Sequence, residues 1–385
     1  MKMGYVFSLA DKLSPALREE LTNPPFTPQF PAGLTPGENI TRQVLRHDVL
    51  LSYPYETMEP FLHLLREAAD DPAVISIKIT IYRLAKRAKL VEYLCNAAEN
   101  GKDVTVMIEL RARFDEQNNI DWSQQLEEAG CHVIYGLAGL KTHCKILLVV
   151  RREEDGLRRY VHMGTGNYND STARQYTDMG MFTCRESYGA DASSLFNVLT
   201  GYSRPPQYNR FVTAPEGMRP FFQRMIERET ENAKNGLPSG IYAKVNSLVD
   251  PDIIYRLYAA SQSGVPVRLV VRGICSLIPG VPGVSENIRV VSLVGQLLEH
   301  SRIFYFHNGG SDEIYMGSAD WMPRNLDRRV EIVFPVEDEK IKKELEHVLD
   351  LEFRDNVKAH ILQPDGTYVK PDKRGKVQLN SQMEF

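Results

Sequence analysis

The sequence has no long apolar run. No stretch of its 385 residues approaches the roughly 18 consecutive apolar residues that a membrane-spanning helix needs. Its first segment, MKMGYVFSLA, lacks the apolar core of a secretory signal peptide. We therefore expect a protein of the cytoplasm.

Cysteine is scarce and unpaired. The five cysteines are odd in number and form no C-x-x-C pair. Disulfide frameworks and zinc sites normally need paired or closely spaced cysteines. We therefore expect reduced thiols: Cys95, Cys131, Cys144, Cys184 and Cys275.

An excess of positive charge is also missing. The chain has 46 basic and 50 acidic residues, a formal net charge of -4. Such a balance argues against a nucleic-acid binder that acts through bulk charge. A polyanion could bind only through a local cluster of arginine and lysine. With 43% apolar and 25% charged residues, the composition is that of a globular protein and excludes a disordered chain, a collagen or a coiled coil.

Two series of alternating helices and strands follow one another, and the length itself favours two domains. The first series has helical spacing over 56–71, 89–101 and 119–130, and strand patterns over 73–82, 103–110, 131–136, 144–150, 158–164 and 175–183. Prolines break the pattern over 203–217. The second series has strand patterns over 240–249, 265–273, 287–295, 302–308, 313–317 and 328–336, then a long helix from Glu337. We predict an irregular leader over 1–40, α/β catalytic domains over 41–212 and 213–369, and a frayed polar tail over 370–385.

The two series repeat each other. Four landmarks recur in the same order, with separations that shrink from 166 to 163, 157 and 153 residues. The pairs are Lys78 with Lys244, Gly101 with Gly264, His143 with His300, and Gly164 with Gly317. A duplicated domain with a pseudo-two-fold axis would bring equivalent strand ends together at one shared site.

Each half carries a histidine two residues before a cation. Lys-Thr-His143-Cys-Lys145 is followed by the turn GTGN, and Glu-His300-Ser-Arg302 is followed by GSAD. On a strand, residues two apart point to one face. An imidazole there can act as a nucleophile or proton donor while the cation holds a phosphoryl oxygen. The small turn residues allow a phosphate to approach backbone N–H groups.

This pattern resembles the phospholipase D superfamily, whose motif is H-x-K-x4-D. Val150 and His307 occupy the aspartate positions and Arg302 replaces the second lysine, which disfavours a lipase or nuclease. Over roughly 46–369 the chain resembles the phosphohistidine-forming bacterial polyphosphate kinases and their C-terminal catalytic domain pair. The motifs are RHDVLLSYPYETMEP, IKITIYRLAK, ELRARFDEQNNI, GLKTHCKILLVVRRE, HMGTGNYNDSTARQYTD, NGLPSGI, SGVPVRLVVRGICSLIPGVPG, LEHSRIFYFHNGG and YMGSADWMPRNLDRRVE.

The resemblance implies a fold and an activity. The fold is two tandem phospholipase D-like α/β sandwiches, related by a pseudo-two-fold, with mixed sheets flanked by helices. The activity is reversible transfer of the terminal phosphate of ATP to polyphosphate through phosphorylated His143, with His300 as the second histidine of the site. Tyr176 and Arg272 match the nucleotide-contacting residues.

The resemblance also implies Mg²⁺ as cofactor and places Arg83 and Arg113 in the magnesium and phosphate region. Because a guanidinium cannot ligate Mg²⁺, we expect both to clamp phosphate oxygens, with the metal held indirectly. Lys145 and Arg302 would add charge to the same cradle, since phosphoryl transfer depends mainly on positioning and charge neutralisation.

The expected partners are ATP or ADP and inorganic polyphosphate, with no nucleic acid. The resemblance further implies a homo-oligomer and peripheral membrane association. The retained residues all address phosphate, so we expect long polyphosphate to bind better than ATP and ATP to be distinguished poorly from GTP.

Some residues and functions stay open. Asp178 and Glu331 share the local offset of 153 and are candidates to orient the imidazoles. His162 is expected either in the core or as an outer partner of the site. Asp115 and Glu116 could hold a metal through water or be exposed turn acids, and Arg324, Arg328 and Arg329 could line a phosphate path or be solvated. A phospholipase D-type phosphodiesterase and a polyphosphate-binding fragment with little turnover remain alternative functions.

Overall fold

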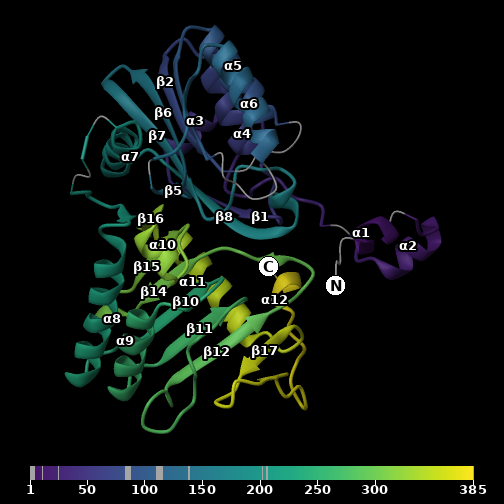
Figure 1. The fold of residues 1–385 in the computed structure, drawn as a ribbon, viewed down its shortest axis with the longest axis vertical. Helices are drawn as coiled ribbons and strands as arrows, with labels where there is room; N and C mark the ends of the chain where they lie inside the picture. The colour runs from purple at the N-terminus through teal and green to yellow at the C-terminus, as the bar shows by residue number, and fades with distance from the viewer. Residues whose placement is uncertain are drawn as a thin grey trace.

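Two mixed β-sheets with flanking helices build the protein, one in each half of the chain (Figure 1). The structure is a computed structural model, and it describes residues 5–10, 12–24, 26–82, 88–109, 116–137, 139–201, 203–204 and 207–384. The predicted fold of two tandem α/β sandwiches is confirmed. The domain boundaries stay a prediction.

The first sheet has the strand order β1-β8-β7-β6-β2-β3-β4. Its strands are β1 (Val49–Tyr53), β2 (Val74–Ile81), β3 (Asp103–Ile108), β4 (His132–Ile134), β6 (Lys145–Glu153), β7 (Gly156–Gly164) and β8 (Tyr176–Thr183). The short helix η1 (Thr172–Arg174) precedes β8. Helices α3 (Ile40–Val44), α4 (Glu59–Asp70), α5 (Lys89–Glu99) and α6 (Glu116–Glu128) pack on one face through a shared apolar core.

The second sheet has the order β18-β17-β12-β11-β10-β14-β15-β16-β5, with β9 paired to β16. Its strands are β9 (Val212–Ala214), β10 (Ile241–Val245), β11 (Val267–Val271), β12 (Ile288–Leu293), β14 (Ile303–Phe306), β15 (Glu313–Gly317), β16 (Arg329–Val336), β17 (Ala359–Leu362) and β18 (Tyr368–Val369). Helices α8 (Met218–Lys234) and α9 (Pro251–Gln262) pack on one face; η2 (Asn308–Gly310) and α10 (Pro323–Asp327) are short.

A third apolar cluster joins the halves. It combines residues of α7 (Glu186–Leu199) and α11 (Glu339–Arg354) with strand residues from both sheets, among them Met163, Met181, Ile303 and Phe334. Burial of this shared apolar surface holds the two sheets together.

The internal repeat is visible in the strand register. Lys145 pairs with Gly164 in the first sheet. In the second sheet Ile303 pairs with Met316, and one residue further the Gly317 N–H donates to the Arg302 carbonyl (3.3 Å). Matching Lys145 with Arg302 and Gly164 with Gly317 gives the offsets of 157 and 153. One landmark was wrong by two residues. Ile79 pairs with Leu147 and Ala243 with Phe304, so Thr80, and not Lys78, is the counterpart of Lys244.

Each half lends a short strand to the sheet of the other. β5 (Lys141–Thr142) pairs in parallel with β16, through Lys141 with Arg329. β13 (Leu298–Glu299) pairs in parallel with β8, through Leu298 with Tyr176. Because each lent strand directly precedes one of the two histidines, the exchange brings both histidines to the junction of the halves.

The leader and the tail differ from their predictions. The leader contains two helices, α1 (Tyr5–Ala10) and α2 (Pro15–Leu21), which lie apart from the body in Figure 1. The tail packs only at its end: α12 (Ser381–Glu384) contacts α11, and Ser381 and Gln382 are buried, whereas most of residues 370–378 are exposed. Among the described residues, no helix combines the length and apolarity needed to cross a membrane.

Candidate active site at the junction of the two halves

His143 is held by residues of the second half. Its backbone N–H donates to the Val330 carbonyl (2.9 Å), which fixes the residue just beyond β5. Its Nδ1 lies 2.9 Å from Glu331 Oε2. Since a carboxylate oxygen accepts, this contact assigns the proton to Nδ1 and leaves the lone pair on Nε2.

Two further donors fix the Glu331 carboxylate. The Ser318 hydroxyl donates to Oε2 (2.5 Å) and the Asn325 amide to Oε1 (2.6 Å). Burial, followed by the charge of Lys145, lowers the pKa of His143 well below its ordinary value. The imidazole is therefore neutral at physiological pH, as a nucleophile must be.

His300 repeats this arrangement with the halves exchanged. Its Nδ1 lies 2.9 and 2.8 Å from the two carboxylate oxygens of Asp178, and the Thr165 hydroxyl donates to Asp178 Oδ1 (2.7 Å). Burial lowers the pKa of His300, although Asp178 opposes the shift. Each acid therefore hydrogen-bonds to the imidazole of the other half, as expected for carboxylates that orient the two rings.

The two cations occupy equivalent positions but differ in their partners. Arg302 donates to Asp320 through Nε (3.3 Å) and Nη2 (3.2 Å), and through Nη1 to the His300 carbonyl (2.6 Å). Lys145 is buried and its amine donates to the His143 carbonyl. Burial lowers the pKa of Lys145 to about 7. Burial also opposes the charge of Arg302, but Asp320, Asp178 and Glu331 together raise the pKa of Arg302 above its ordinary value, so it stays charged.

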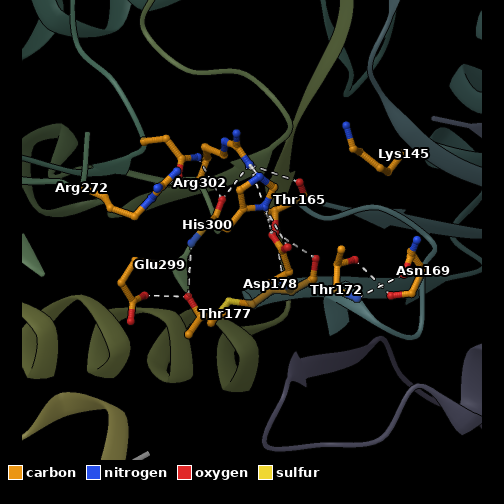
Figure 2. A network of polar contacts seen from close by, with 12 residues as sticks. Lys145, Thr165, Asn169, Thr172, Thr177, Asp178, Arg272, Glu299, His300 and Arg302 are labelled. Carbon is orange, nitrogen blue, oxygen red and sulfur yellow. Dashed lines mark hydrogen bonds and ion pairs between the residues drawn. The ribbon is translucent and has the colours of Figure 1, made fainter. Parts of the chain in front are cut away.

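Arg272 lies on the His300 side (Figure 2), and Tyr176 packs against the His300 ring. Arg272 donates through Nε (2.9 Å) and Nη2 (2.6 Å) to Asn246 Oδ1, and the Tyr176 ring centroid is 5.1 Å from that of His300. Both residues line a cleft of about 670 Å³. Leader residues Phe26 and Pro28 line it too, so the described chain provides a partly apolar pocket beside Arg272 and Tyr176, which sequence reasoning missed.

Two other residues at the site were missed. The Asn246 amide oxygen accepts both hydrogen bonds from Arg272. The backbone N–H of Asn246 in turn donates to Asp320 Oδ1 (2.7 Å). Tyr82 packs edge-on against His143 at 5.0 Å, and its ring centroid lies 5.3 Å from Lys145 Nζ. Tyr82 belongs to the motif IKITIYRLAK and stands directly before Arg83, which was a usable signal.

Several candidates lie outside the described residues or away from the two histidines. Arg83, Arg113 and Asp115 lie outside the described residues, as does the side chain of Glu116. Arg324 and Arg328 are exposed, whereas Arg329 Nη1 lies 3.7 Å from Glu331 Oε1.

His162 is a core residue, as expected. It is buried among Phe61, Tyr168 and Phe182, and burial lowers its pKa to about 3. A side chain at Gly180 would collide with it, since a Cβ there would stand 2.3 Å from His162 Nε2.

The described residues around the histidines do not fit a metal site formed by the protein. Asp178, Glu331 and Asp320 are each engaged with an imidazole or a guanidinium. Within the described ranges, no group of three or more histidine, cysteine, aspartate or glutamate residues could hold a metal ion. How Mg²⁺ would be held stays a prediction.

Comparison with known proteins identifies the family. The models of polyphosphate kinase C-terminal domains 1 and 2 match residues 39–205 and 211–382. The chain belongs to the polyphosphate kinase family. It is 49% identical to the polyphosphate kinase of Lactiplantibacillus plantarum, over 95% of this chain and 51% of that protein. It is 55% identical to that of Synechocystis, over 87% of this chain and 46% of that protein.

Solved structures agree with this placement. The crystal structure of polyphosphate kinase from Porphyromonas gingivalis superimposes with a TM-score of 0.90 at 35% identity, covering 97% of this chain and 57% of that one. A phosphatidylserine synthase from Haemophilus influenzae shares the fold alone, with a TM-score of 0.53 at 12% identity over 83% of this chain and 88% of that one. The chain spans about half the length of the curated polyphosphate kinases it matches.

Proposed function

We propose that this chain is an ATP:polyphosphate phosphotransferase that works through a phosphohistidine at His143. The observation that carries the proposal is the reciprocal pairing of His143 with Glu331 and His300 with Asp178, beside Lys145, Arg302 and Arg272. A neutral imidazole with its Nδ1–H fixed has its free lone pair on Nε2, and the cations neutralise the transferred phosphoryl group.

In the first step, the His143 Nε2 lone pair attacks the terminal phosphorus of ATP. An N–P bond forms, the bond between that phosphorus and the bridging oxygen breaks, and ADP leaves with the bonding electrons. Glu331 accepts the Nδ1–H bond throughout and stabilises the positive charge that develops on the ring. Lys145 and Arg302 offset the charge on the phosphoryl oxygens.

In the second step, a terminal oxygen of polyphosphate attacks the phosphorus of phospho-His143. The new P–O bond lengthens the chain by one phosphate, the N–P bond breaks, and neutral His143 is restored. Running both steps backwards makes ATP from ADP. His300, oriented by Asp178, is proposed to act on the nucleotide side, where proton transfer to or from a phosphate oxygen is within its chemistry.

The cleft beside Tyr176 and Arg272 is proposed to hold the nucleotide. Arg272 would contact phosphate, while Phe26 and Pro28 would cover an apolar face of the base. Mg²⁺ is the proposed cofactor, and when bound it would supply further positive charge beside the transferred phosphoryl group. Arg83 and Arg113 stay proposed phosphate clamps.

Labelling with γ-³²P ATP and Mg²⁺ tests the proposal. The wild-type chain should acquire label that is lost in acid and retained in base, and polyphosphate or ADP should remove it. His143→Ala should abolish labelling, whereas the exposed His132→Gln should retain it as a matched control. Label mapped by mass spectrometry to another residue would refute the assignment, and hydrolysis of a phosphodiester without labelling would favour the diesterase alternative. Polyphosphate binding without either reaction would favour the binding fragment.

The setting of the activity is also a proposal. All five cysteines are free, which supports the reducing cytoplasm as the compartment. Homo-oligomerisation, peripheral membrane association and the absence of a nucleic-acid partner stay predictions. So does the division at residues 40, 212 and 369.

A further inference from the structure

The two histidines differ in what lies behind them. At the positions equivalent to Lys244 and Glu299, the first half has Thr80 and Thr142. The first half thus has hydroxyl groups at these two positions: Thr80 donates to the Cys144 carbonyl (2.8 Å), and the Thr142 N–H donates to the buried Glu109 carboxylate (3.0 Å). Among its described residues it has no buried lysine paired there. Because buried charges are costly to desolvate, the charges of the second half need a reason other than the fold.

In the second half these charges form one buried network. Lys244 Nζ lies 2.5 Å from Glu299 Oε2 and also contacts Glu352. The Thr177 hydroxyl donates to Glu299 Oε2 (2.6 Å). Burial opposes ionisation of both partners, but Lys244 lowers the pKa of Glu299, and Glu299 and Glu352 raise that of Lys244 to about 12. Lys244 and Glu299 are therefore a charged pair.

Gln382 of α12 joins this network to the segment before His300. Its amide N–H donates to the Leu297 carbonyl (3.0 Å) and to Glu299 Oε1, and its Oε1 accepts from the Leu297 N–H (3.0 Å). The fit is close, since a Cβ at Gly295 would stand 2.2 Å from Gln382 Oε1. Gln382 thereby holds Leu297 and Glu299 of the segment 295–299, and Lys244 holds Glu299.

The same segment serves two parts of the site. Glu299 directly precedes His300, whose N–H donates to the Thr177 carbonyl (3.2 Å). Leu297 and Leu298 line the cleft that Tyr176 and Arg272 share. Figure 2 shows Glu299 and Thr177 next to His300 and Asp178. A displacement of 295–299 would move both the imidazole and a wall of the cleft.

We propose that Lys244 and Gln382 are positioning residues that act through Glu299 to set the His300 imidazole and the 293–298 wall of the cleft. The kinetic consequence of this role, a selective effect on the KM for the nucleotide, rests on the proposed function. His143 is anchored by Val330 and Glu331 and does not depend on the network.

The test compares Gln382→Ala and Gln382→Met with the wild type and with Gln363→Ala, a half-buried glutamine of the same half outside the network. The first readout is the ¹⁵N and ¹H resonances of the histidine rings. Those of His300 should shift in both Gln382 variants, while those of His143 and the core His162 should not. This readout is independent of turnover, so it stands even if the phosphotransferase proposal fails.

The second readout is kinetic. The KM for ATP should rise about tenfold in the Gln382 variants, the size of effect typical for loss of an outer partner of a site residue, while the KM for polyphosphate stays near that of the wild type. Unchanged His300 resonances would overturn the proposal, whatever the thermal stability. Equal changes in the His143 and His300 resonances would also overturn it. Failure of Gln382→Met to fold where the wild type folds would overturn it too, since the network would then be only structural.

Discussion

Replacing Lys145 by arginine should change how polyphosphate binding depends on pH. The amine of Lys145 is buried beside His143 and Tyr82, and burial lowers its pKa to about 7. The amine is protonated below that pH and loses its proton above it. A bound phosphate oxygen favours the charged form, so binding must raise the pKa of Lys145 and take up a proton from solution.

The size of the uptake follows from the pKa. At pH 8 about one-tenth of the Lys145 amines in the free protein carry the proton. A rise of ~2 pKa units on binding would leave about nine-tenths of them protonated, so ~0.8 proton is taken up per site. At pH 6 the amine is already charged and the uptake nearly vanishes. Wild-type affinity should therefore weaken towards alkaline pH by up to about tenfold per pH unit. Arginine stays protonated in both states and contributes no uptake.

Calorimetric titration of polyphosphate in two buffers of different ionisation enthalpy measures the protons directly. We expect the wild type and Lys141→Arg to show uptake at pH 8, and Lys145→Arg to lack it. Lys141 is a matched control because its amine lies at the same 5.3 Å from the Tyr82 ring centroid. Equal uptake by wild type and Lys145→Arg would refute the reasoning and assign the proton to the imidazoles.

Three other substitutions test the site. Asp178→Asn should lower turnover by about 10- to 100-fold by releasing the His300 ring yet leave phosphorylation of His143 detectable; loss of the label would contradict the division of roles. Phe26→Ala should reduce any preference for ATP over GTP in competition binding, with polyphosphate affinity unchanged, and an unchanged preference would place the base elsewhere. Arg272→Lys should weaken ATP binding because one ammonium cannot contact both Asn246 and phosphate as a guanidinium fork does; wild-type affinity would remove Arg272 from the phosphate site.

Secondary structure was predictable where the pattern is local. The strands around both histidines were expected from alternating apolar residues, and β6, β7, β8, β14, β15 and β16 lie there. α8 was overlooked although Met218, Phe221, Phe222, Met225 and Ile226 follow helical spacing. Its many charged residues and the prolines before it obscured the pattern.

The tail shows a limit of composition. Residues 370–385 are polar and were expected to fray, yet Gln382 is buried. Its partners, Leu297 and Glu299, lie more than eighty residues away in the chain. A polar side chain is buried at little cost when its hydrogen bonds are satisfied, and only the tertiary structure supplies those partners.

The sequence by itself determined the duplicated frame, the two histidines, their cations and the small turn residues, because each of these features is a short motif that repeats at a nearly constant offset. Only the tertiary structure decided which carboxylate serves which histidine. His143 and Glu331 are 188 residues apart, and His300 and Asp178 are 122 apart. These pairs meet because β5 adds to the sheet of the second half and β13 to that of the first. Such an exchange depends on backbone hydrogen bonds between sheet edges, which no side-chain pattern encodes.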